Sequence, residues 1–498
     1  MTLPDLTRMA AVSTAEWRGL AKHLAGLGLT PARVEPIVSA AARVHPALRR
    51  PIRNHHLRRI EGPAGFAMRM FLFSDPVREE EARAAVGDKL DWLVEIGLLA
   101  RGEGTVVSPF VMSLFNELFL LSDELTRGGD AVMGFGEGTI ELCRAAFPVR
   151  AIGTALDLGC GSGTCALVLA AAAKRVIATD INPRALVMAG VNARLNGIEN
   201  VELREGDLFA PLEGMEVDLI ASQPPFVPLP DGSEGAVFLS GGRRGDELGL
   251  KVLSEVKRHL RPGGRAVLRV DWPEYGEERL EKRLYKAVGE GADLLLLASP
   301  GVSPEHHASG YASGIHPVLD KAFEDEATRR LAHLERSGIR AIVPCLTVVR
   351  RSSGEQSFAG RLDVVALGRA QVSGERVEAL MAARDVAGDP DALLAARLRV
   401  PEGTTLAQEQ VGPGAEVEST LWARFADAAL VHPMPLTEEL LILITAVHEA
   451  DDVRSGLAAF AEMTETALEQ AMAEGLPVVA RALVAGLLEL AAPPGQLH

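Results

Sequence analysis

The sequence predicts an α/β fold, in which a mostly parallel sheet is flanked by mainly helical regions. From about residue 150 to about residue 350, short apolar runs alternate with helical segments. This alternation is typical of a parallel sheet with helices on both faces. A glycine-rich turn follows the first apolar run. The chain before about residue 145 has helical periodicity, and helices also follow residue 370.

Length and composition favour a multidomain globular protein. The chain has 498 residues, 47% of them hydrophobic, and a net charge of −16. An acidic surface repels phosphate backbones, which argues against a dedicated nucleic-acid binder. The four cysteines have no CxxC spacing, so we expect neither a zinc site nor a disulfide framework. The first residues lack the pattern of a signal peptide, and no long apolar run is present. We therefore expect a cytoplasmic location and no membrane partner.

We expect three domains, with boundaries at 1–145, 146–370 and 371–498. Residues 79–112 read as two helices and a two-stranded wing, which indicates a winged helix in the first domain. The second of these helices, Lys89 to Ile96, also carries acids, so packing or shaping a substrate entrance is favoured over DNA binding.

A basic segment lies in the first domain. Residues 43–59 hold six arginines, three histidines and no acid. This composition suits a solvated or interdomain face, or alternatively a patch that binds anions or docks a carrier protein.

The middle domain contains seven predicted strands. The first five are separated by helical segments and should be parallel. The last two should form an edge pair that follows a helix at 276–289 and is interrupted by a helical insertion at about 317–337. The runs are TALDLG, RVIATD, VELREGD, VDLIASQ, RAVLRVD, DLLLLAS and AIVPCLTVVR. The segment 304–317 between the last two strands, rich in Gly and Ser, suits a mobile lid.

The first strand leads into LDLGCGSGT, residues 156–164. Asp157 lies in this strand, and Gly159, Gly161 and Gly163 turn the chain into a helix with Cys160 between them. Glycine is needed where the backbone takes positive φ values and where a ligand approaches it closely.

Ligand-type residues also end the next three strands. Asp180, followed by Ile181, is placed to bind the two hydroxyls of a ribose. Asp207 is placed to meet an adenine amino group, and Leu208 to donate its backbone N–H. The fourth strand runs into SQPPF, residues 222–226, where two prolines fix a corner. Open α/β sheets bind ligands at this edge.

Residues 154–270 resemble class I S-adenosylmethionine-dependent methyltransferases. The resemblance rests on DLGCGSG, the TD of the second strand, GDLF, QPPF and the glycine-containing segment 238–250. The group is the small-domain one, whose fourth motif is (N/D)PPY or (N/D)PPF. It includes glutamine-amide and rRNA-base N-methyltransferases. The resemblance implies a Rossmann-like seven-stranded fold and S-adenosyl-L-methionine as cofactor. The implied cofactor-binding residues are Asp157, Gly159, Cys160, Gly161, Gly163, Asp180, Ile181, Asp207, Leu208 and Ser222.

Gln223 departs from the Asn or Asp of that motif. In the group, the Asn or Asp oxygen and a proline-corner carbonyl accept N–H bonds of a planar nitrogen, and the aromatic ring stacks on the planar group. This assigns catalytic roles to Gln223, Pro224 and Phe226. The extra methylene of Gln moves the oxygen by about 1.5 Å, and a displacement near 1 Å can cost on the order of 100-fold in rate. We therefore expect a rearranged pocket or a different nucleophile.

Further candidates follow the fifth and sixth strands. His306 or His307 is predicted to act as general base for a hydroxyl acceptor, with a pKa near the working pH; a solvated loop with incidental histidines is the alternative. Asp271 either orients the substrate or ends a strand.

The main expectation is methyl transfer to an N or O nucleophile of a small-molecule or carrier-bound metabolite, as in secondary metabolism. The alternative is an RNA-base or protein (glutamine-type) N-methyltransferase. A non-enzymatic ligand sensor is a third possibility, disfavoured because the ligand-type acids and the PPF corner are intact. Nucleic acid is the less favoured partner, and no metal is expected.

Overall fold

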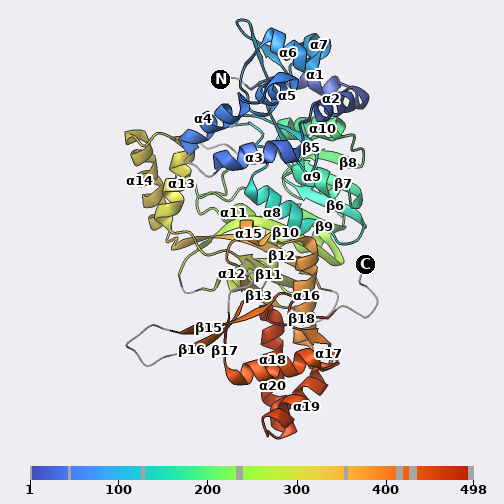
Figure 1. The fold of residues 1–498 in the computed structure, drawn as a ribbon, viewed down its shortest axis with the longest axis vertical. Helices are drawn as coiled ribbons and strands as arrows, with labels where there is room; N and C mark the ends of the chain where they lie inside the picture. Colours follow the sequence, from blue (N-terminus) through green and yellow to red (C-terminus); the bar gives the residue numbers. More distant parts are fainter. Residues whose placement is uncertain are drawn as a thin grey trace. The chain divides into compact units, whose positions relative to one another are not determined.

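The computed structural model describes residues 3–42, 46–124, 129–230, 239–276, 278–352, 357–410, 419–424 and 434–491. The chain forms two compact units (Figure 1), residues 1–294 with 301–359 and residues 295–300 with 360–498. The first unit includes both the N-terminal region and most of the sheet. The three-domain division at 145 and 370 therefore stays a prediction.

The central sheet contains all seven predicted strands and an eighth. Its order is β13-β11-β12-β10-β9-β6-β7-β8, where β13 (Ala359–Asp363) is the strand that the sequence analysis did not expect. The predicted strands are β6 (Ile152–Leu158), β7 (Ala173–Asp180), β8 (Val201–Glu205), β9 (Val217–Ser222), β10 (Leu260–Glu274), β11 (Ala292–Ala298) and β12 (Ala341–Arg351).

The pairing of these strands confirms the mostly parallel sheet. β6 pairs in parallel with β7 and with β9, β7 with β8, and β9 with β10. β10 pairs with β12 in antiparallel register. Because β6, β7 and β9 are neighbours, their carboxyl ends lie at one edge of the sheet. The glycine loop, Asp180 and the SQPPF corner follow these three ends and are thus brought together.

Helices connect the strands, as the alternating pattern predicts. They are α9 (Thr164–Leu169), α10 (Pro183–Asn196), α11 (Glu247–Val256) and α12 (Leu280–Val288), and α8 (Glu137–Ala146) leads into the first strand, β6. Asn182 caps α10 by accepting from Arg184 N–H, and Gly197 ends the helix with a φ of 66°. Such caps satisfy backbone groups that the helix leaves unpaired.

The segment 304–317 is helical over most of its length, and its expected role as a mobile lid stays a prediction. This segment forms helix α13 (Pro304–Ile315), which packs on α14 (Lys321–Arg336), the predicted insertion. Ser303 caps α13 by accepting from His306 N–H at 3.3 Å, and Pro304 occupies the first turn, where its missing N–H costs nothing. These start signals outweigh the helix-weakening glycines of the segment.

The N-terminal region begins with helices α1 (Thr7–Ala11), α2 (Thr14–Gly26), α3 (Pro31–Ala42), α4 (Pro46–Leu57) and α5 (Gly62–Ala67), followed by a π-helical turn, η1 (Met68–Leu72). Next come β1 (Val77–Arg78), α6 (Glu79–Val86), α7 (Lys89–Glu95), β2 (Ala100–Arg101) and β3 (Thr105–Val107). The helices α6 and α7 and the β2–β3 hairpin lie at the predicted positions, and β1 adds a third strand to the hairpin. The winged-helix assignment itself stays a prediction.

The N-terminal region shares one hydrophobic core with α10. Figure 1 shows α1 and α2 beside α10, and the buried Trp17 and Leu20 belong to the same cluster as Met188 and Leu195 of α10. The hairpin of β4 (Val111–Phe115) and β5 (Leu118–Ser122) is joined to α10 by Asn192. This fully buried side chain accepts from Leu121 N–H at 2.8 Å and donates to the carbonyl of Leu121 at 3.0 Å.

Part of the basic segment lies outside the described residues, namely positions 43–45. Most of the rest forms α4, and Arg58 pairs with Asp75 at 3.4 Å. The two alternatives for this segment therefore stay open. Within the described ranges, no helix has the length and apolar character needed to cross a membrane.

The second unit has a helical part and two small sheets. Its helices are α15 (Leu367–Ala370), α16 (Gly374–Gly388), α17 (Pro390–Leu394), α18 (Glu438–Glu449), α19 (Val453–Met463) and α20 (Leu468–Ala485). β14 (Leu398–Arg399) pairs with β18 (Glu489–Leu490). β15 (Thr405–Gln410), β16 (Ser419–Arg424) and β17 (Met434–Leu436) form a three-stranded sheet that the sequence analysis did not expect.

Candidate functional site

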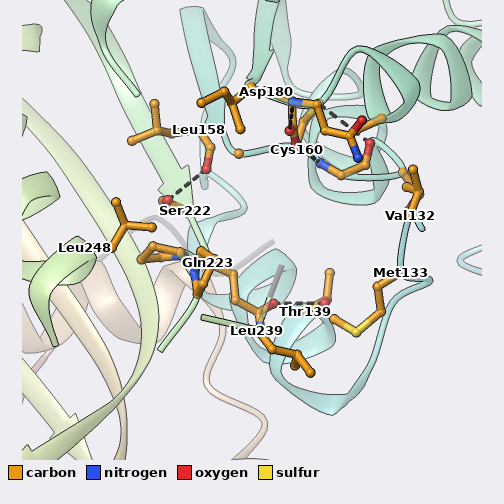
Figure 2. A pocket seen from close by; sticks show the side chains of 18 of the residues that line it. Val132, Met133, Thr139, Leu158, Cys160, Asp180, Ser222, Gln223, Leu239 and Leu248 are labelled. Carbon is orange, nitrogen blue, oxygen red and sulfur yellow. Dashed lines mark hydrogen bonds between the residues drawn. The ribbon is translucent and has the colours of Figure 1, made fainter. Parts of the chain in front are cut away.

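A cavity of about 820 Å³ lies at the carboxyl edge of β6, β7 and β9, within the first unit (Figure 2). Twelve of the sixteen predicted site residues line it: Asp157, Gly159, Cys160, Gly161, Asp180, Ile181, Asp207, Leu208, Ser222, Gln223, Pro224 and Phe226. Gly163, Asp271, His306 and His307 are not among its lining residues.

The glycine loop turns because its three glycines adopt positive φ values. These are 76° at Gly159, 52° at Gly161 and 82° at Gly163. A Cβ at Gly159 or Gly161 would meet no protein atom within 4 Å, so the backbone there is open to a ligand. A Cβ at Gly163 would lie 2.9 Å from the Ala189 Cβ, so this glycine permits close packing on α10 instead.

Two carboxylates hold the loop. Asp157 accepts from Ala166 N–H at 2.8 Å, and Asp180 accepts from Gly161 N–H at 2.8 Å. Burial raises the pKa of Asp157 to about 7, against the Ala166 N–H bond, which lowers it, and with the nearby Asp180, which raises it further. Burial also raises the pKa of Asp180. Both groups therefore favour a bound cation, which would offset the cost of their ionisation.

The third strand end offers one polar and one apolar contact, Asp207 and Leu208, and the second strand end adds the apolar Ile181. Asp207 forms an ion pair with Lys251 at 2.9 Å, and both side chains are about half exposed. A carboxylate has four lone-pair sites, so Asp207 retains capacity for an amino group. Leu208 has a positive φ of 47°, and Ile181 is 59% exposed although apolar. An exposed apolar side chain at a cavity wall suits the face of an aromatic ring.

The corner after β9 is held from two sides. Ser222 donates its hydroxyl to the carbonyl of Leu158 at 2.8 Å, which ties β9 to β6. Val227 and Leu239 form a backbone hydrogen bond at 3.0 Å, so the corner continues into a ladder with the glycine segment. A Cβ at Gly241 would lie 2.6 Å from the Phe226 Cα, so glycine is required there for close approach. This explains the described part of the segment 238–250; residue 238 lies outside the described ranges.

Gln223 points toward α8, as Figure 2 shows. Its Oε1 accepts a hydrogen bond from the Thr139 hydroxyl at 2.9 Å. A Cβ at position 138 would lie 2.8 Å from Gln223 Nε2. The first turn of α8 therefore has both the space and the donor that the longer Gln side chain uses. The sequence analysis missed this contact because 84 residues separate the two partners.

Two further segments line the cavity, of which the sequence analysis singled out only the second, as a lid. One is the chain before α8, which contributes Val132, Met133 and Phe135, and the other is α13, which contributes Tyr311. Figure 2 places Val132 and Met133 beside the glycine-loop and Gln223 parts of the cavity. No motif marks these residues. Tyr311 is one of the three tyrosines of the chain, and it lies in the segment that the sequence analysis read as a lid.

Apart from Gly163, the predicted site residues that do not line the cavity lie on α13 and β10. His306 is exposed. His307 is 8% exposed, and the centroid of its ring lies 4.7 Å from that of Tyr311. Neither ring nitrogen of His307 has a hydrogen-bond partner among the described residues. Burial lowers the pKa of His307 to about 4, which is not the near-neutral value expected of a general base. Asp271 pairs with Arg269, and Arg269 Nε donates to Glu141 of α8 at 2.5 Å.

Taken together, the lining fits a sulfonium-bearing nucleoside. The open glycine backbone, the carboxylate of Asp180 and the exposed Ile181 suit a ribose and an adenine. The charged side chains among the described lining residues are Asp157, Asp180 and Asp207, and all are acidic. Their sign suits a cation rather than a polyphosphate.

Comparison with known proteins agrees with this geometry. Residues 137–286 match the family model described as "Methyltransferase small domain". This part of the chain, called the methyltransferase domain below, is similar to that family, and it has the predicted Rossmann-like fold.

Curated relatives of the methyltransferase domain include two release factor glutamine methyltransferases. The protein from Moorella thermoacetica is 38% identical over 147 residues, which are 27% of this chain and 51% of the relative. The protein from Gloeobacter violaceus is 34% identical over 143 residues, which are 26% of this chain and 49% of the relative. The chain thus spans about half the length of the curated relatives it matches.

Solved structures share the fold only loosely over the full chain. A ribosomal protein L11 methylase from Lactobacillus delbrueckii subsp. bulgaricus matches with a TM-score of 0.24 and 24% identity, over 32% of this chain and 68% of that protein. A score this low carries no argument about function.

Proposed function

We propose that this protein transfers a methyl group from S-adenosylmethionine to the amide nitrogen of a glutamine side chain in a protein. The observation that carries the proposal is the position of the Gln223–Pro224–Phe226 corner. It lines the same cavity as the glycine loop, so a planar acceptor on the corner lies next to the cofactor site. The names of the two relatives support a protein glutamine as acceptor rather than a metabolite or an RNA base.

When bound, the cofactor supplies an activated methyl group for in-line displacement. Asp180 and Ile181 hold its nucleoside in this proposal, and Asp207 meets the adenine amino group. The acceptor amide rests against Phe226, and its N–H groups donate to Gln223 Oε1 and to the carbonyl of the proline corner. A carbonyl oxygen has two lone pairs, so Gln223 Oε1 can serve the acceptor while it accepts from Thr139.

The reaction forms an N–CH₃ bond, breaks the S–CH₃ bond and releases one proton from the amide nitrogen. The role of general base predicted for His306 or His307 stays a prediction. His307 lies one turn before Tyr311 on α13, behind the cavity wall rather than on it. Asp271 is joined to Arg269 and through it to α8, and an indirect effect on the site suits this arrangement better than substrate contact.

The test is a methylation assay with isotope-labelled S-adenosylmethionine and a bacterial release factor as acceptor. We expect label on a glutamine, located by mass spectrometry, and none when that glutamine is replaced by asparagine. Gln223→Ala should lower turnover by about 100-fold and leave the affinity for S-adenosylhomocysteine nearly unchanged. Gln223→Asn should also be less active than the native enzyme, because the shorter side chain no longer reaches its partner on α8.

Two other outcomes would replace this acceptor. Label on RNA, with binding that weakens steeply as salt is added, would favour the RNA-base alternative. Label on low-molecular-weight compounds alone would favour the metabolite acceptor of the main expectation, which the relatives do not support.

A further inference from the structure

The first turn of α8 holds a hydrogen-bonded chain that ends on Gln223. Gly136 N–H donates to the Thr139 hydroxyl at 3.4 Å, and Thr139 donates to Gln223 Oε1 at 2.9 Å. The Thr139 hydroxyl can therefore accept from the backbone and donate to Gln223 Oε1 at the same time. An amide whose oxygen faces this donor is held against the flipped orientation, which would place its NH₂ group there.

The same turn leaves room for the longer side chain. Gly138 precedes Thr139, and a Cβ on it would lie 2.8 Å from Gln223 Nε2 and 3.4 Å from Arg269 Cγ. Gly138 has no positive φ, so the helix backbone does not require a glycine there. The close approach of Gln223 is the physical reason that the structure gives for this glycine.

A buried ion-pair network fixes the turn itself. Arg269 of β10 is 9% exposed, and it pairs with Glu141 of α8 at 2.5 Å and with Asp271. Glu141 is two residues from Thr139, so the network anchors α8 to the sheet next to the Thr139 contact. Breaking a buried pair is costly, which keeps the turn in place.

We propose that Thr139 is a positioning residue that sets the orientation of the Gln223 amide, and that Gly138 supplies the space for it. The glutamine at position 223 is then accommodated by Gly138 and Thr139 of α8, which supply the space and the hydrogen-bond donor for its longer side chain. The proposal rests on the proposed function for the nature of the reaction, but the contact itself can be tested without any acceptor.

The ligand-free test is a double-mutant cycle in thermal unfolding. Thr139→Val should lower the melting temperature by about 1–2 °C, the effect expected of one hydrogen bond in a unit of this size. In the Gln223→Ala background the same substitution should shift it by about half as much, because only the bond from Gly136 N–H is then lost. Equal shifts in both backgrounds would overturn the proposed contact.

The functional test compares three variants at α8 with release factor as acceptor. Thr139→Val should lower kcat by about tenfold, and Thr139→Ser, which keeps the hydroxyl, should restore most of this loss. Gly138→Ala should lower kcat by about 10- to 100-fold while the melting temperature stays or rises, because alanine favours the helix. All three should bind S-adenosylhomocysteine within about twofold of the native affinity by calorimetry.

A matched control is Thr445→Val in α18, where the hydroxyl donates to the carbonyl of Leu441 at 2.8 Å. It should leave kcat at the native value. A Gly138→Ala variant that loses stability and activity together would show a merely structural role and would overturn the positioning role. If the native enzyme does not methylate release factor, the proposed acceptor fails, and the thermal cycle still decides the Thr139–Gln223 contact.

Discussion

At the scale of single residues, Gln223 shows how a departure from a motif is accommodated. The sequence places an extra methylene where a family uses a shorter side chain, and a shift of about 1.5 Å follows from bond lengths alone. In the fold, the longer side chain ends on the Thr139 hydroxyl at 2.9 Å and lies over a glycine. Its length is therefore matched by a second element.

Asp180 gives the clearest residue-level prediction for the cofactor site. Asp180→Ala removes a carboxylate that accepts from Gly161 N–H and is placed to meet a ribose. Bonds to charged groups contribute about 1.5–3 kcal/mol, so affinity for S-adenosylhomocysteine should fall by about 10- to 100-fold in calorimetry. Glu205→Ala is the matched control, since Glu205 pairs with Asp180 across the strands but does not line the cavity. Unchanged affinity in Asp180→Ala would refute the ribose role.

Asp157 predicts a pH dependence of stability. Its pKa rises from an ordinary 3.8 to about 7 on folding. Between about pH 4 and about pH 7, the Asp157 carboxyl is therefore protonated in the folded state but ionised in the unfolded state. The free energy of unfolding falls as the pH rises through this range, and above about pH 7 Asp157 adds no further pH dependence.

Asp157→Asn keeps an oxygen for Ala166 N–H and removes the titration. The melting temperature of this variant, relative to the native protein, should increase from about pH 4 to about pH 7. A difference that stays constant over this range would show that Asp157 is ionised in the folded protein throughout. The Asp180 carboxyl, whose pKa is also raised by burial, contributes a slope of the same sign in both proteins.

At the scale of elements, α13 is the main departure from what the sequence indicated. Its two internal glycines suggested a lid, but Ser303 and Pro304 start a helix that packs on α14. Packing against a neighbour stabilises a helix more than local propensity does. As a helix, α13 can present Tyr311 to the cavity at a fixed position, which a mobile loop would not do.

The helical state of α13 predicts that alanine at Gly310 is stabilising. A Cβ there would meet no atom within 4 Å and the φ is not positive, so Gly310→Ala should add about 0.5–1 kcal/mol to the free energy of unfolding. Gly289 is a control with the opposite expected effect. A Cβ on Gly289 would also fit without a clash, but the residue adopts a φ of 75°. Gly289→Ala should destabilise by about 1 kcal/mol in urea unfolding. A destabilised Gly310→Ala would argue against the helix.

At the scale of the first unit, the N-terminal region and the methyltransferase domain depend on each other. Helix α10 packs into the N-terminal core, and Asp123 links the two by a fully buried carboxylate that pairs with Arg184 at 2.6 Å. Asp123 also accepts from Val132 N–H at 2.9 Å, and Val132 lines the cavity. Asp123, in the N-terminal region, thereby helps to position Val132 in the cavity wall.

Arg184→Ala should therefore affect both stability and binding. It leaves a buried carboxylate without its ion-pair partner, which costs about 3 kcal/mol of unfolding free energy, and it frees the segment that carries Val132. We expect a lower melting temperature and weaker S-adenosylhomocysteine binding. Arg175→Ala, which breaks the half-exposed pair with Glu202, should cost at most about 1 kcal/mol and leave binding unchanged. Full binding in Arg184→Ala would separate the N-terminal region from the cofactor site.

The sequence by itself determined the seven predicted strands, the glycine loop and the acids at the strand ends. These features are local: apolar runs, turn glycines and strand-end residues follow one another along the chain, and parallel pairing brings them to one edge. Twelve of the predicted site residues line the cavity for this reason. The helix-start residues of α13, Ser303 and Pro304, are also local in the sequence, although the glycines that follow them favoured a loop.

Only the tertiary structure decided what closes the site and what holds its catalytic corner. Thr139 meets Gln223 across 84 residues, and Asp123 meets Arg184 across 61. Tyr311 reaches the cavity from a helix beyond the matched family domain. Such contacts leave no periodic or local trace, because they depend on how separate elements pack. The cofactor half of the site is therefore readable from the sequence, whereas the acceptor half is set by packing.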